Sequence, residues 1–189
     1  MSSPFAVIGI GNLLFKDEGL GVYAAKYLEE NYQFSPPVEL IDGGTLGLNM
    51  IHLYQRYERV IILDTISVEG SDEAGTIYNL NADALQGLGD CRKTAHEIEV
   101  LQTLELGALA GDMADIQIIA MVPEDMTEVS MSITPTVMEA MPQFIEAILA
   151  ELAEWRVVYE LKENGLSLPA IIERYNQQQA SSPSIGENR

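Results

Sequence analysis

Hydrophobic positions along the chain alternate between short, β-rich runs and longer segments with helical spacing. The short runs have the length and composition of buried or half-buried strands, and they occur at 5–10, 38–41, 60–63, 75–80 and 115–122. Apolar residues at three- and four-residue spacing predict helices over about 18–31, 46–56, 94–109 and 135–155. Strands separated by helices predict an α/β fold, with a mainly parallel sheet of about five strands and helices on both faces.

Local signals refine three of these elements. Thr94 and Glu97 have the spacing of a capping box at the start of a helix. Thr134 followed by Pro135 is typical of an N-cap with proline at the first helical position. The run at 75–80 has the half-exposed pattern of a strand at a sheet edge.

The hydrophobic periodicity weakens beyond Val157, which indicates a domain boundary there. We predict an α/β domain over 1–157 and a C-terminal extension of short helices over 158–175. Residues 176–189 are polar and rich in Gln and Ser, which predicts a disordered tail. On this interpretation the extension is peripheral.

The charge and composition of the chain disfavour some classes of binding partner. Acidic side chains number 29 against 10 basic ones, a formal charge of −19, which disfavours nucleic acid and anionic lipid. The same charge suits a cation or a basic protein partner, and it is equally compatible with solubility alone. There is no apolar run long enough to cross a membrane and no basic region typical of a signal peptide. With Cys91 as the single cysteine, a reducing, cytoplasmic location is expected.

Three predicted strands end in segments that could carry chemistry. These segments are Gly9–Asn12, Asp42–Thr45 and Asp64, and the carboxyl ends of parallel strands form one rim where ligands bind. The Gly-Ile-Gly run suggests a dinucleotide site, but Leu14 replaces the third glycine of that motif. Acidic residues at the start of the next helix would also repel a pyrophosphate.

Glu18, Asp64 and His96 are the candidate metal ligands. Glu18 could simply complement a helix dipole, and Asp64 could simply form a turn after its strand. His96 is expected in the first turn of the helix that Thr94 opens, where the positive dipole favours a neutral imidazole. Two carboxylates and one neutral imidazole suit a divalent metal with open positions. No H-E-x-x-H, G-x-S-x-G or P-loop motif is present.

Four segments, in order, carry a resemblance to a known family. They are G-I-G-N-L-L-F-K-D-E-G-L-G at 9–21, D-G-G-T-L-G at 42–47, V-I-I-L-D at 60–64 and S-I-T-P-T-V at 132–137. Together they resemble the motifs of the hydrogenase maturation proteases, and the match covers about residues 5–152. The resemblance implies a three-layer α/β/α sandwich around a five-stranded sheet, and peptidase activity.

The resemblance also implies a substrate and a site. The substrate would be the precursor of the nickel–iron hydrogenase large subunit, which loses a short C-terminal extension after nickel insertion. Nickel would be supplied by the substrate, and another divalent metal could substitute. By motif, the metal ligands and catalytic residues are Glu18, Asp64 and His96, and the substrate-binding residues are Asp42, Gly43, Gly44 and Thr45.

The sequence is compatible with several alternatives. The metal could polarise the scissile carbonyl or a water, or a carboxylate could act as general base while the metal serves recognition alone. A non-catalytic metallochaperone or assembly factor for the hydrogenase could use the same three ligands. A dinucleotide-binding module is the remaining alternative. We expect a monomer.

Overall fold

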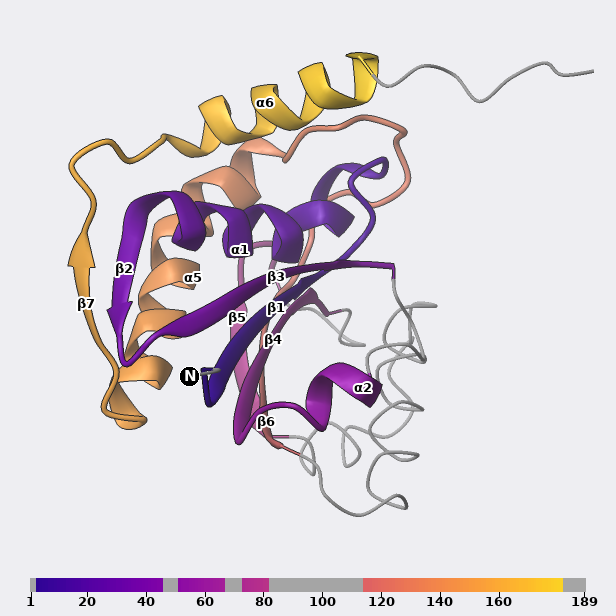
Figure 1. Ribbon diagram of the computed structural model, residues 1–189. Coiled ribbons are helices and arrows are strands. Elements are labelled where there is room, and N and C mark those ends of the chain that lie inside the picture. The colour runs from indigo at the N-terminus through magenta and orange to yellow at the C-terminus, as the bar shows by residue number, and fades with distance from the viewer. Residues whose placement is uncertain (1–2, 46–50, 67–72, 82–113, 182–189) are drawn as a thin grey trace, which may run out of the picture.

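A five-stranded sheet forms the centre of the molecule (Figure 1). The computed structural model describes residues 3–45, 51–66, 73–81 and 114–181. The sheet has the order β3-β1-β4-β6-β5, and its first four strands are parallel while β5 runs antiparallel at the edge. The strands are β1 (Phe5–Ile10), β3 (Val38–Gly44), β4 (Arg59–Thr65), β5 (Ile77–Asn81) and β6 (Asp115–Met121). All five predicted strands, including the edge strand, are confirmed.

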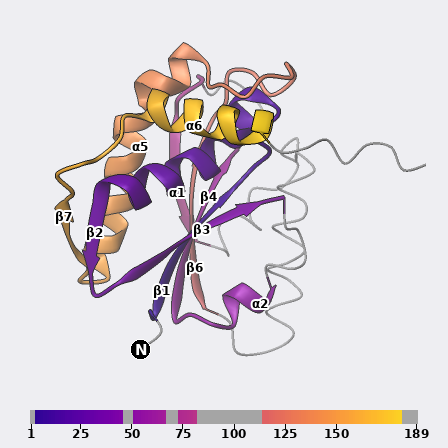
Figure 2. The ribbon, with the colours of Figure 1, turned by 45° about the horizontal axis from the view of Figure 1, so that its top comes forward.

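Helices cover both faces of this sheet, as Figures 1 and 2 show. One face carries α1 (Leu20–Asn31), α5 (Pro135–Glu154) and α6 (Leu168–Ser181), and the opposite face carries α2 (Ile51–Tyr54). A 3-10 helix, η1 (Lys16–Gly19), precedes α1. The α/β sandwich is therefore confirmed, as is the start of α5 with Thr134 at the N-cap and proline in its first turn. The helix predicted over 94–109 and the first part of the one over 46–56 lie outside the described residues.

The two faces of the sheet bury separate hydrophobic cores. Val7, Ile61 and Leu63 pack against α1, α5 and α6. Ile8 and Ile62, which alternate with them, pack against the α2 side. Because successive strand residues point to opposite faces, the same alternation decides toward which face each polar residue at a strand end points.

The C-terminal extension is built into this body. Val158–Leu161 forms strand β7, which pairs antiparallel with β2 (Tyr32–Ser35) in a separate two-stranded sheet. We expected helices over 158–175 and a disordered tail from 176, whereas β7 is a strand and α6 continues to Ser181. Ile171 of α6 is 1% exposed within the α1–α5 core, so the extension is not peripheral.

A glycine allows α1 to lie directly on the ends of the central strands. A Cβ at Gly21 would lie 2.2 Å from the carbonyl oxygen of Leu63 and 2.4 Å from that of Ile10. Real Cβ atoms do not approach oxygen so closely. The first turn of α1 therefore packs backbone to backbone on β1 and β4.

We predict that Gly21→Ala destabilises the protein, although alanine normally stabilises a helix by about 1 kcal/mol relative to glycine. The added methyl must displace the carbonyls of Leu63 or Ile10, so the free energy of unfolding in urea should fall by about 1–3 kcal/mol. Glu29→Ala, on the exposed side of the same helix, should change it by less than about 0.5 kcal/mol. A Gly21→Ala protein as stable as the Glu29→Ala control would contradict the close contact.

Candidate active site

Strand pairing brings the predicted segments together at one rim. Gly9 of β1 pairs with Asp42 on one side and with Leu63 on the other, so β1 lies between the Asp42 segment and Asp64. Just beyond, the backbone N–H of Gly11 donates to the carbonyl of Gly44 at 3.0 Å. The rim predicted from the strand ends is thus present in the structure.

Glu18 reaches this rim through a second close backbone contact. Gly11 has φ of +136°, a conformation that glycine adopts without a steric penalty. A Cβ there would lie 1.8 Å from the carbonyl oxygen of Glu18. The turn that carries Glu18 therefore rests on the end of β1, and its side chain is half-buried. The chain itself fills the space that a pyrophosphate would need beside Gly11, which argues against a dinucleotide site.

Asp64 lies at the buried end of β4. It is 5% exposed, and its Oδ1 accepts the backbone N–H of Thr65 at 2.8 Å. Alternation along β4 places it on the α2 face, where Tyr54 is fully buried. Burial and, after it, the negative charge of Asp64 raise the pKa of the Tyr54 phenol. That hydroxyl stays protonated at neutral pH, so on the α2 side Asp64 faces a neutral phenol.

The Asp42–Thr45 segment ends β3, and Asp42 faces the α6 side of the sheet. A Cβ at Gly43 would lie 2.8 Å from Cγ2 of Ile8, so only glycine fits there without a shift, and Gly44 has φ of +44°. Asp42 is exposed and its Oδ2 accepts a hydrogen bond from the hydroxyl of Tyr175 in α6 at 3.3 Å. The two glycines let the segment turn tightly and leave the side chains of Asp42 and Thr45 at the surface.

Of the three predicted metal ligands, the structure places two. Glu18 and Asp64 come to adjoining strand ends, whereas His96 lies outside the described residues. Within the described ranges, no group of three or more His, Cys, Asp or Glu side chains could hold a metal ion. The other histidine, His52, is exposed in α2. Carboxylate oxygens and an imidazole form a donor set that divalent metals accept, so the three-ligand site stays a prediction.

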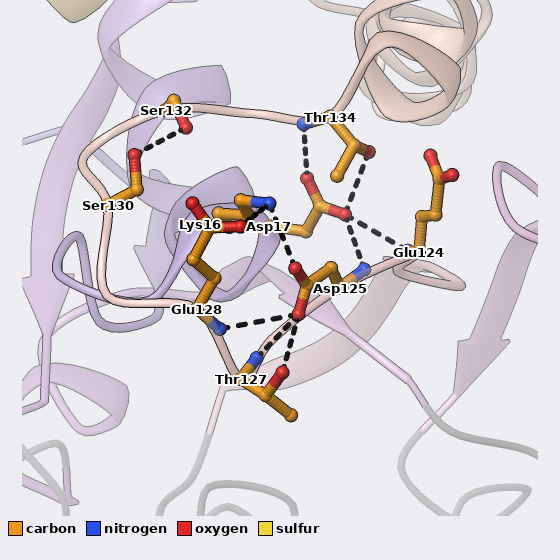
Figure 3. A network of polar contacts seen from close by, with 9 residues as sticks. All are labelled: Lys16, Asp17, Glu124, Asp125, Thr127, Glu128, Ser130, Ser132 and Thr134. Carbon is orange, nitrogen blue, oxygen red and sulfur yellow. Dashed lines mark hydrogen bonds and ion pairs between the residues drawn. The ribbon is translucent and has the colours of Figure 1, made fainter.

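Asp17 is the residue that sequence reasoning missed. Its carboxylate is fully buried and accepts four hydrogen bonds (Figure 3). The backbone N–H groups of Glu124 and Asp125 donate to Oδ2 at 3.0 Å. The backbone N–H of Thr134 donates to Oδ1 at 2.7 Å, and its hydroxyl donates to Oδ2 at 2.9 Å. Because Thr134 precedes the first turn of α5, the positive end of that helix dipole also faces the carboxylate.

A second set of polar contacts closes the loop around this carboxylate (Figure 3). Lys16 Nζ lies 2.9 Å from Oδ2 of Asp125 and also pairs with Glu128. The N–H of Thr127 and the ammonium of Lys16 hold the pKa of Asp125 below its usual range. Lys16 has φ of +41°, and its backbone N–H donates to the carbonyl of Ser130 at 2.9 Å. The η1 turn is thereby held to this loop at Lys16 as well as at Asp17.

Comparison with known proteins decides the family. The family model described as hydrogenase maturation protease matches residues 22–151, more than half of the chain. The chain belongs to the hydrogenase maturation proteases. The matched range includes Asp64 and His96, while Glu18 lies just before it.

Individual relatives agree with this membership. The chain is 29% identical to the hydrogenase expression/formation protein HoxM of Cupriavidus necator, across 96% of this chain and 86% of that protein. It is also 29% identical to the hydrogenase 2 maturation protease of Escherichia coli, across 78% of this chain and 90% of that protein. A solved structure of the hydrogenase-maturating endopeptidase HybD from E. coli superposes with a TM-score of 0.76 at 28% identity, across 84% of this chain and 97% of HybD.

This hydrogenase maturation protease is therefore an enzyme, a peptidase that acts in hydrogenase maturation. Among the described residues there is no helix of the length and apolarity that a membrane crossing requires.

We predict that Asp17→Asn destabilises the protein by about 2–4 kcal/mol, because an amide nitrogen cannot accept the hydrogen bonds that now converge on the carboxylate. The charge facing the α5 dipole is lost as well. The matched control is Asp115→Asn, whose carboxylate is 74% exposed and should cost less than about 0.5 kcal/mol in a urea titration. Equal stability of the two variants would show that Asp17 does not hold the turn.

Proposed function

We propose that this maturation protease removes a short C-terminal extension from the precursor of a nickel–iron hydrogenase large subunit after nickel has been inserted. Glu18, Asp64 and His96 bind the nickel that the precursor carries. The exposed Asp42–Thr45 segment contacts the polypeptide. The observation that carries the proposal is the pair of backbone contacts, at Gly11 and Gly21, that bring the Glu18 turn onto the strand ends beside Asp64.

The chemistry of the donors supports a metal carried by the substrate. Glu18 and Asp64 supply oxygen ligands from two different segments, and a cation between them would relieve the mutual repulsion of two carboxylates. A substrate that brings its own cation is therefore bound in preference to the same substrate without one. Binding of the nickel at the rim thus also places the precursor for cleavage.

The metal ligand Asp64 and the polypeptide-binding residue Asp42 lie on opposite faces of the rim. Asp64 faces α2 and Asp42 faces α6, with the end of β1 between them. A peptide held by the Asp42 segment would cross β1 to reach the metal ligands. Hydrolysis then adds a water to the scissile carbonyl, breaks the C–N bond and transfers a proton to the leaving amine. A carboxylate at the rim that is not held by the metal is the group suited to take the proton from water.

We predict that the protease shortens a nickel-loaded large-subunit precursor and leaves the nickel-free precursor intact, because only the loaded form supplies the cation. Intact-mass spectrometry of both precursors after incubation measures this directly. Equal cleavage of the two forms would refute nickel recognition. Stable binding of the loaded precursor without any mass loss would favour the assembly-factor alternative.

We predict that Glu18→Gln, Asp64→Asn and His96→Ala each lower kcat/KM for the loaded precursor by about 100-fold or more, as expected when a metal ligand is lost. His52→Ala is the matched control, since that histidine is exposed in α2 and should keep full activity. Circular dichroism and melting temperature establish that each variant is folded. A folded variant with wild-type activity removes its residue from the site.

A further inference from the structure

The C-terminal helix α6 is held across the same rim by buried anchors. Leu168, Ile171 and Ile172 are each less than 10% exposed in the core shared with α1 and α5. Arg174 adds an ion pair to Glu30 of α1 at 3.6 Å. These anchors fix the axis of α6 and with it the position of Tyr175, the next residue.

Tyr175, directly after these anchors, contacts Asp42. Its hydroxyl donates to Oδ2 of Asp42 at 3.3 Å across 133 residues of sequence. Burial and, after it, the charge of Asp42 raise the pKa of this phenol. The hydroxyl therefore stays protonated at neutral pH and remains a hydrogen-bond donor to the carboxylate.

The ring of Tyr175 is supported from beneath by a second tyrosine. Tyr23 of α1 packs edge-on against it with ring centroids 5.7 Å apart. Tyr23 is fully buried, and a Cβ at Gly19 would lie 3.2 Å from its Cε2. Gly19 directly follows Glu18, so one chain of contacts joins α6 to the turn that carries a predicted metal ligand.

A further contact ties α6 to the loop before α5. Asn176 Nδ2 donates to the carbonyl of Met131 at 3.2 Å. This loop leads into Thr134, which is bound to Asp17. Helix α6 thus contacts both the end of β3 and the loop that leads into α5.

From these contacts we infer that Tyr175 is a positioning residue, which holds the Asp42 carboxylate in the orientation that binds the substrate polypeptide, and that α6 forms the outer wall of the substrate-binding segment. The inference rests on the proposed function, in which Asp42–Thr45 contacts the precursor. It assigns the C-terminal extension a direct part in substrate binding.

The test compares four full-length proteins: wild type, Tyr175→Phe, Asp42→Asn and the double variant. Phenylalanine keeps the ring contact with Tyr23 and removes only the hydroxyl. Initial rates on the nickel-loaded precursor give KM and kcat, and equilibrium binding of the nickel-free precursor gives a Kd that needs no cleavage. Tyr159→Phe, on exposed strand β7, is the matched control.

Tyr175→Phe is expected to raise KM and Kd about three- to tenfold, the usual effect of losing a hydrogen bond to a charged group at a partly exposed site. The kcat and the melting temperature should not change, and the substitution should have no further effect in the Asp42→Asn protein. A purely structural role would instead lower the melting temperature and act equally in both backgrounds, which would overturn the inference.

The same measurements distinguish a wrong role for Tyr175 from a wrong role for the Asp42 segment. If Asp42→Asn raises KM and Kd while Tyr175→Phe leaves both within twofold of wild type, only the positioning role is lost. If Asp42→Asn itself leaves both unchanged, the substrate-binding assignment of the Asp42 segment is wrong, and the inference about Tyr175 falls with it.

Discussion

The rim of the sheet depends on backbone contacts that only glycine permits. Gly11 and Gly21 let the chain fold back over β1 and β4 with carbonyl oxygens where side chains would otherwise stand. A side chain at either position would push the Glu18 turn and the start of α1 away from the ends of β1 and β4. The glycines bring the two acidic residues to adjoining strand ends without supplying any chemistry themselves.

The buried carboxylate of Asp17 also holds the Glu18 turn in place, through hydrogen bonds and charge. A buried carboxylate is costly unless donors replace the water that it loses, and here three backbone amides, one hydroxyl and the start of α5 do so. The compensating groups come from segments more than 100 residues further along the chain. Folding of the β6–α5 connection therefore fixes the position of Glu18, the next residue in sequence.

Much of this architecture could be predicted from the sequence, because periodicity and capping are local signals. The five strands and the start of α5 at Thr134 are examples. Strand β7 could not be predicted, because its four residues are exposed and it is stabilised by pairing with β2, which is distant in sequence. Asp17 looked like an ordinary acid at a helix start because its donors are remote in sequence. The meeting of the Asp42 segment and Asp64 at one rim could be predicted, because the carboxyl ends of parallel strands lie at the same edge of a sheet. The roles of these residues and of Glu18 stay predictions.

The excess of acidic side chains bears directly on the carboxylates at that rim. Lys16, the cation closest in sequence to Glu18, is already paired with Asp125 and Glu128. Its charge therefore stabilises the loop around Asp17 and contributes little to neutralising Glu18 or Asp64. Under the proposed function, a cation delivered by the substrate would relieve the mutual repulsion of the Glu18 and Asp64 carboxylates, and a precursor without metal would leave that repulsion in place. On that proposal, the acidic charge of the chain and the backbone contacts at Gly11 and Gly21 both favour a metal-bearing substrate.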